Sequence, residues 1–101
     1  MLAEFSVVPL GKGESVSRYV AECLRIVEDS GIRYRINPMG TVLEGGFDEV
    51  MGVIKECHFR VMGMSTRCIT SIKIDDRKGV ADALDKKVES VENLVGRKLN
   101  K

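Results

Sequence analysis

Residues 32–44 read IRYRINPMGTVLE, and this stretch decides the fold. Apolar Ile32, Tyr34 and Ile36 alternate with polar side chains, which is the pattern of a half-buried strand. The turn residues at 38–40 interrupt the alternation, and a second strand follows at 41–44. Because the connection is so short, the two strands are expected to form an antiparallel hairpin.

Strands and helices alternate on both sides of this hairpin. Period-2 alternation predicts the outer strands, and apolar residues that recur at spacings of three and four predict the helices. Ser15 is the expected N-cap of the first helix, and Gly31 follows its last residue. The expected elements outside the hairpin are a strand at 2–8, a helix at 15–30, a helix at 47–62, a strand at 66–75 and a third helix at 81–95.

This order predicts an α+β fold of the ferredoxin-like βαββαβ type in a single domain, residues 1–101. Two right-handed crossovers around a hairpin give a four-stranded antiparallel sheet in the order 2–3–1–4. Two helices cover one face, and the C-terminal helix is additional. The opposite face is expected to be polar and to suit water, a ligand or a partner sheet. Its residues are Glu4, Ser6, Arg33, Arg35, Asn37, Ser71 and Lys73.

Composition and charge exclude several classes of protein. The formal net charge is +1 and the charges are interspersed, which argues against a nucleic-acid partner. No stretch approaches the roughly 20 apolar residues of a membrane span, and the first strand, with Glu4 in it, is expected to be neither a signal peptide nor an anchor. The three cysteines are far apart in sequence and fall at apolar positions, so we expect reduced thiols in a cytoplasmic protein, without a structural disulfide.

The small size of the chain predicts self-association. About 100 residues bury only about two thirds of the surface that the unfolded chain exposes, so further burial between copies would add stability. The third helix, whose apolar seam is narrow, could cap part of the polar sheet face or reach a neighbouring subunit. A homodimer or homotetramer is therefore expected.

Residues that could carry catalysis or bind a metal are few. His58 is interpreted as a histidine at the edge of the core, and the pair Asp75 and Asp76 as partners of Arg77 and Lys78 in a charged turn. The loop at 11–13 is interpreted as a plain turn rather than an anion site. No set of three or four convergent ligands is evident, so no metal, cofactor or catalytic activity is expected.

Several motifs along the chain match a known family. They are EFSVVP at 4–9, YRINPMGT at 34–41, Glu44 before the second helix, and TSIKIDDR at 70–77. In these features the chain resembles the small thiamine-binding-protein family, the YkoF-like group, long known as an uncharacterised protein family. The resemblance implies a ferredoxin-like fold, dimers that pair into tetramers and, in some members, binding of thiamine or its pyrimidine half near subunit contacts.

The leading hypothesis is a non-catalytic binding protein for a thiamine-like heterocycle, with its pocket beside the polar sheet face and the turn at 37–41. A neutral aminopyrimidine needs a few aimed donors and acceptors and an apolar wall. The expected polar contacts are Asn37, Thr41, Ser6 and the main chain at Met39 and Gly40. The expected apolar wall is formed by Met39 and Val8. Glu44 is a group that could face a ligand cation. The alternative is a structural or regulatory homo-oligomer without a ligand; an enzyme is the least favoured class.

Overall fold

The fold is built on a four-stranded antiparallel sheet in the order β2-β3-β1-β4. The structure, a computed structural model, describes residues 1–13, 16–79 and 82–101. The expected α+β fold and strand order are confirmed. In chain order the elements are β1 (Leu2–Pro9), α1 (Ser17–Ser30), β2 (Arg33–Asn37), β3 (Gly40–Glu44), α2 (Phe47–Met62), β4 (Cys68–Asp75) and α3 (Ala83–Val95).

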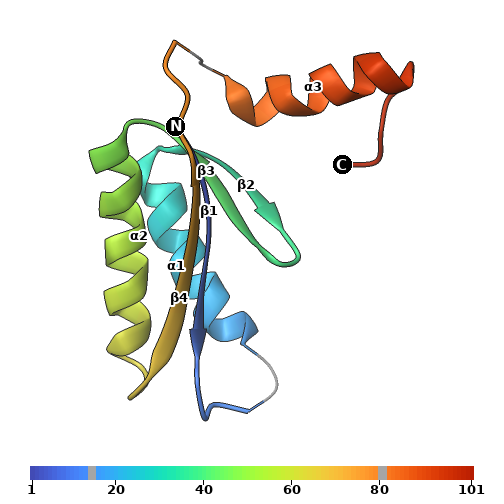
Figure 1. Ribbon diagram of the computed structural model, residues 1–101. Helices are drawn as coiled ribbons and strands as arrows, with labels where there is room; N and C mark the ends of the chain where they lie inside the picture. The colour runs from blue at the N-terminus through green and yellow to red at the C-terminus, as the bar shows by residue number, and fades with distance from the viewer. Residues whose placement is uncertain (14–15, 80–81) are drawn as a thin grey trace.

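Helices α1 and α2 lie side by side on one face of the sheet (Figure 1). The central strand β1 points Ala3, Phe5 and Val7 into the layer between sheet and helices, while Glu4 points to the open face. The apolar stripes of the two helices meet these residues and complete one core. This agrees with the alternation expected for residues 2–8.

The helix boundaries follow local backbone requirements. Gly31 ends α1 with a φ of 74°, a left-handed conformation that glycine adopts without a steric cost, and its amide donates to the carbonyl oxygen of Glu28. The expected end of this helix is therefore confirmed. The expected N-cap Ser15 lies outside the described residues, and α1 begins at Ser17 after Val16. Similarly, Ala81 is not described, and α3 begins at Ala83.

Strand β4 is less buried than its alternation suggests. The alternation of residues 66–75 predicts Ile72 and Ile74 on the core side, opposite Ser71 and Lys73, yet they are 41% and 43% exposed. The reason is that β4 is the edge of the sheet, while α2 packs mainly on β1. An alternating pattern identifies which side chains share a face but not whether a helix reaches over that face.

The strands on the two sides of β1 differ in length, and this difference shapes one end of the sheet. Strand β4 pairs with β1 along all eight residues, from Leu2 to Pro9. Strand β3 pairs with it only from Leu2 to Phe5, because the hairpin turns back at Pro38 and Met39. Among the described residues, β1 therefore has a neighbouring strand on one side only from Ser6 onward.

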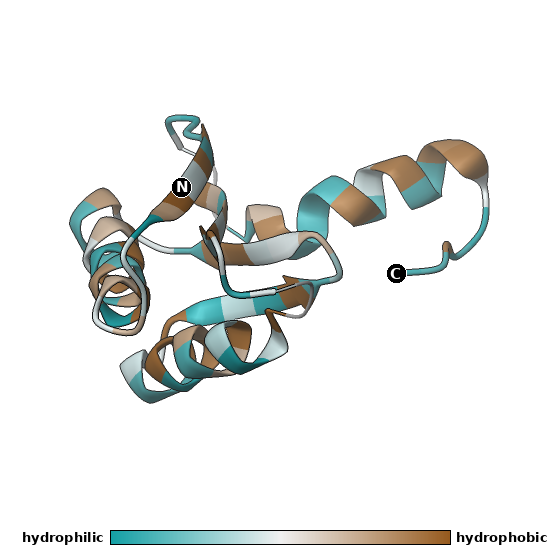
Figure 2. Cartoon of the chain, turned by 90° about the horizontal axis from the view of Figure 1, so that it is seen from below, coloured by the Kyte–Doolittle hydropathy of each residue, from teal (hydrophilic) through white to brown (hydrophobic). Residues whose placement is uncertain are grey.

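Helix α3 projects from the sheet instead of joining the helix layer (Figures 1 and 2). Its first turn is held by ion pairs from β2: Arg33 to Asp82 at 2.8 Å and Arg35 to Asp85 at 2.7 Å. Leu84 is buried at this contact. The rest of the helix extends beyond the sheet, and three of its apolar residues are exposed: Val91 (48%), Leu94 (88%) and Val95 (51%).

Two carboxylates fasten α3 and the tail that follows it. Asp75, at the end of β4, pairs with Lys87 of α3, and not with its neighbours Arg77 and Lys78 as the sequence suggested. Glu92 accepts hydrogen bonds from the Leu99 amide and from the Lys101 ammonium group, both at 2.6 Å. The hydrogen bond from Lys87 lowers the pKa of Asp75, and the hydrogen bonds from Lys101 and Leu99 lower the pKa of Glu92.

Acid is expected to release α3 before it unfolds the core. Both carboxylates have a lower pKa in the folded protein than in the unfolded chain. Their contribution to the stability of the docked α3 and its tail is therefore complete above the ordinary pKa values of 3.8 and 4.5, and it is lost as the pH falls through the lower pKa values of the folded protein. Backbone NMR relaxation of residues 83–95 between pH 6 and pH 3 should show increasing motion of α3 while β1 stays rigid.

An Asp75→Asn variant should show part of this mobility already at pH 6, because the amide cannot attract Lys87. Asp76→Asn is the matched control, since it removes the adjacent carboxylate and leaves the pair of Asp75 and Lys87 intact. Equal mobility of α3 at pH 6 and pH 3 in the unaltered protein would contradict this account.

Candidate functional site

A cavity of about 320 Å³ lies where β3 ends beside β1. Its walls come from the second half of β1, the tip of the β2–β3 hairpin and the first turns of α1. The described residues that line it are Phe5, Ser6, Val7, Val8, Val16, Val20, Cys23, Leu24, Ile36, Asn37, Pro38, Met39, Gly40 and Thr41. None of these carries a charge, and most are apolar.

The main chain of Val7 faces this cavity. Backbone groups alternate sides along a strand, and the Leu10 amide bonds to the carbonyl oxygen of Arg67 on the β4 side. The carbonyl oxygen of Phe5 instead points to Gly40 on the β3 side, 3.1 Å from where a Cβ of that glycine would stand. The N–H and C=O of Val7 therefore point the same way as those of Phe5, into the gap beyond the last β1–β3 pair.

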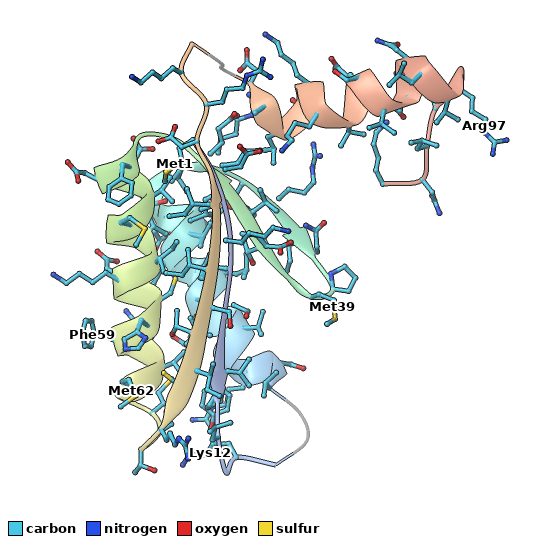
Figure 3. The ribbon with its side chains drawn as sticks, viewed as in Figure 1. Met1, Lys12, Met39, Phe59, Met62 and Arg97 are labelled. Carbon is cyan, nitrogen blue, oxygen red and sulfur yellow. The ribbon has the colours of Figure 1, made fainter. Side chains whose placement is uncertain are left out.

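Six of the seven residues predicted from the sequence line this one cavity. They are Ser6, Val8, Asn37, Met39, Gly40 and Thr41. Thr41 is 5% exposed at the inner end of the hairpin, whereas Met39 is 89% exposed at its tip (Figure 3). The cavity thus has a buried polar end and an exposed, polarisable thioether at its rim. That these residues bind a ligand remains a prediction.

Glu44 lies away from the cavity, at the opposite end of β3. Its carboxylate is 3.4 Å from the Arg33 guanidinium and accepts a bond from the Leu84 amide, also at 3.4 Å. Glu44 therefore helps to hold α3, and the structure does not bring it together with the other predicted residues. The cavity itself lies between the hairpin and α1, rather than on the open sheet face.

Sequence reasoning missed the contribution of α1. Val16, Val20, Cys23 and Leu24 follow helical spacing, and that spacing was interpreted only as core packing. The half of this stripe nearest the N-terminus extends past the end of the hairpin and lines the cavity instead. The signal that could have found it is the difference in strand length: the predicted strands 2–8 and 41–44 have seven and four residues, and the observed β1 and β3 have eight and five.

A second cluster, on α2 and β4, joins His58, Thr70 and Cys68. The His58 Nδ1 is 2.6 Å from the Thr70 hydroxyl, as expected for a histidine with a local partner, and 3.9 Å from the Cys68 sulfur. The sequence did not predict this approach of Cys68. None of the three lines the cavity. Within residues 1–13, 16–79 and 82–101, no group of three or more histidine, cysteine or acidic residues could hold a metal ion.

Fold and cavity together define a small ferredoxin-like protein with an uncharged cavity of about 320 Å³. A family model described as thiamine-binding protein matches residues 3–92. A UPF0045 protein of Mycobacterium tuberculosis is 42% identical over 98 residues, covering 96% of each chain. The chain belongs to the thiamine-binding protein family.

Solved structures share the fold. The crystal structure of a hypothetical protein of Methanocaldococcus jannaschii has a TM-score of 0.84 and 39% identity, covering 89% of this chain and 93% of that one. A candidate thiamine biosynthesis or salvage protein of Thermotoga maritima has a TM-score of 0.76 at 22% identity, covering 89% of this chain and 96% of that one, and shares the fold. In the part of the chain that the structure describes, no helix is long and apolar enough to cross a membrane.

A side chain at Gly40 is expected to crowd its neighbours, because its Cβ would stand 3.1 Å from the Phe5 carbonyl oxygen and 3.3 Å from the Glu4 Cγ. Gly40→Val should lower the free energy of unfolding by about 1–3 kcal/mol through this overpacking, and Gly40→Ala by less. Urea unfolding followed by circular dichroism measures both.

Gly52→Ala provides the control for that comparison. Gly52 lies within α2, and a Cβ there would meet nothing within 4 Å. This substitution should stabilise the protein by about 0.5–1 kcal/mol, because alanine favours a helix over glycine. If Gly40→Val proved as stable as the parent protein, the close approach of the hairpin to β1 would be wrong.

Proposed function

We propose that this protein is a non-catalytic binding protein for a neutral heterocycle of the thiamine pyrimidine type, acting as a homo-oligomer. The observation that carries the proposal is the uncharged cavity of about 320 Å³, which six residues selected from the sequence line together. That volume is near the lower limit of small-molecule sites. The match to a thiamine-binding protein model over residues 3–92 supports the same ligand class.

The polar groups of the cavity suit an aminopyrimidine. Such a ring offers an amino donor next to ring-nitrogen acceptors on one edge. The N–H of Val7 is a matching donor and its C=O a matching acceptor, side by side on the part of β1 beyond its last described pair with β3. The Asn37 amide and the Thr41 hydroxyl supply further donors and acceptors, while Val20 and Leu24 offer apolar surface to the ring face.

The charged remainder of thiamine would lie outside this cavity. A smaller hollow of about 120 Å³ adjoins it on the open sheet face and shares Phe5, Ser6 and Met39 with it. Glu4 and Lys73, which are opposite each other on β1 and β4, line this hollow. A thiazolium cation is attracted by Glu4 and a phosphate by Lys73, but both charges stay in contact with water and add little affinity.

A binding role is favoured over catalysis by the residues at the cavity. Cys23 is the only thiol among the described lining residues, and none of them is a histidine, aspartate, glutamate or lysine that could act as its base. His58 is engaged with Thr70 in the other cluster. The family model is likewise that of a binding protein.

Calorimetric titration should give similar affinities for hydroxymethylpyrimidine and thiamine, and no gain for thiamine diphosphate, because the cavity receives only the neutral ring. Thr41→Val should weaken binding of hydroxymethylpyrimidine by about 1–3 kcal/mol, since it leaves a buried ligand group without its partner. Thr41→Ser should retain most of the affinity.

Thr66→Val makes the same chemical change at an exposed threonine outside the cavity and should leave the affinity unchanged. Absence of binding heat with all three compounds would remove the binding claim and favour a purely structural role.

That structural role is the second candidate, and the exposed apolar residues of α3 favour it. Helix α3 extends beyond the sheet (Figure 2), and its exposed Val91, Leu94 and Val95 are apolar surface that a second copy could cover. Sedimentation at micromolar concentration should show a dimer or tetramer, and Leu94→Lys should shift it toward an 11.2 kDa species. Lys86→Glu, also on an exposed position of α3, is the control for a change of charge. A single 11.2 kDa species in the parent protein would exclude both the oligomer and this role.

A further inference from the structure

Two cysteines far apart in the sequence face each other where α1 packs on α2. The sulfur of Cys23 is 3.9 Å from the carbonyl oxygen of Cys57, and the sulfur of Cys57 is 3.6 Å from the carbonyl oxygen of Cys23. Both side chains are buried, at 5% and 0% exposure. Each thiol thus lies against the main chain of the other, on two helices that no disulfide links in this structure.

The two thiols differ in how a reagent can reach them. Cys23 is part of the wall of the 320 Å³ cavity, whereas Cys57 is not among the residues that line it. A small neutral oxidant that enters the cavity therefore meets Cys23 first. Cys57 is fully buried and does not line the cavity, so we expect it to react with a group already formed on Cys23.

The pKa shifts of the two thiols also favour oxidation of Cys23 before Cys57. The hydrogen bond from the Cys57 thiol lowers the pKa of Cys23, and the nearby Arg60 guanidinium acts in the same direction against the effect of burial. The same interaction and burial raise the pKa of Cys57. A thiolate is the reactive form of cysteine, so Cys23 is the better nucleophile of the pair.

We propose that Cys23 and Cys57 form a reversible disulfide between α1 and α2 when a peroxide enters the cavity. This proposal goes beyond the binding function and does not depend on which ligand occupies the site. It replaces the expectation of three unconnected thiols with one reactive pair and one separate thiol, Cys68.

The chemistry balances with hydrogen peroxide as the oxidant. The Cys23 thiolate attacks one peroxide oxygen, the O–O bond breaks, and hydroxide leaves and is protonated to water, which gives a sulfenic acid. The Cys57 sulfur then attacks the sulfur of Cys23, the S–O bond breaks, and a second water leaves. Two thiol protons and two electrons pass to the peroxide in total, and a dithiol reductant reverses the change.

Tryptic mapping tests the proposal directly, because each cysteine lies on its own peptide: 19–25, 56–60 and 68–73. The full-length protein is treated with hydrogen peroxide, blocked with N-ethylmaleimide in denaturant and digested. We expect peptides 19–25 and 56–60 to appear joined, about 2 Da lighter than the sum of the two thiol peptides, while 68–73 carries the maleimide. Dithiothreitol added before blocking should return all three as maleimide adducts.

Variants distinguish the two roles. Cys57→Ala should leave Cys23 as a sulfenic acid that dimedone traps, whereas Cys23→Ala should leave Cys57 unmodified. Cys68→Ser is the control and should form the Cys23–Cys57 link at the parent rate. The proposal is overturned if the treated parent protein shows maleimide on both Cys23 and Cys57, or if its disulfides involve mainly Cys68; that mapping requires no variant to fold.

Discussion

The pairing of β1 with strands of unequal length is the constraint on which the candidate site depends. Strand β4 follows β1 to Pro9, whereas β3 leaves it after Phe5. Beyond Phe5, the backbone groups of β1 that point away from β4 have no described β3 partner. The apolar side chains of α1 at this end line the cavity instead of packing on a strand. A cavity with a polar edge and apolar walls is the direct outcome. Between Leu2 and Phe5 the core is closed, because β1 pairs there with both β3 and β4.

The sequence predicted most of the fold because its elements are set by local patterns. Alternation and helical spacing identify strands and helices whatever surrounds them, and Gly31 marks the end of α1. Those patterns do not show how far the helices extend over the face of the sheet. Ile72 and Ile74 lie on the predicted face but at the sheet edge, so they remain partly exposed. Asp75 similarly reaches Lys87 of α3 instead of its sequence neighbours.

The site was predictable in part for the same reason. Asn37 to Thr41 are contiguous, so a local motif places them together, and Ser6 and Val8 join them because β1 runs past the hairpin. Glu44 was misplaced because it follows Thr41 by only three residues, a separation that spans about 10 Å along an extended strand. The residues of α1 were missed because their position depends on how a helix lies over the end of a sheet. The Cys23–Cys57 approach is likewise a property of helix packing.

The open edge at Val7 has a consequence for how such a site can evolve. A ligand that is held by main-chain N–H and C=O groups depends on the backbone conformation and not on the identity of the side chains. Val7 could be exchanged for another β-branched or apolar residue, and the same donor and acceptor would face the ligand. Under the proposed function, such a site would tolerate exchange of the Val7 side chain, while a single-residue slip in the β1–β4 register would turn the other set of backbone groups toward the cavity.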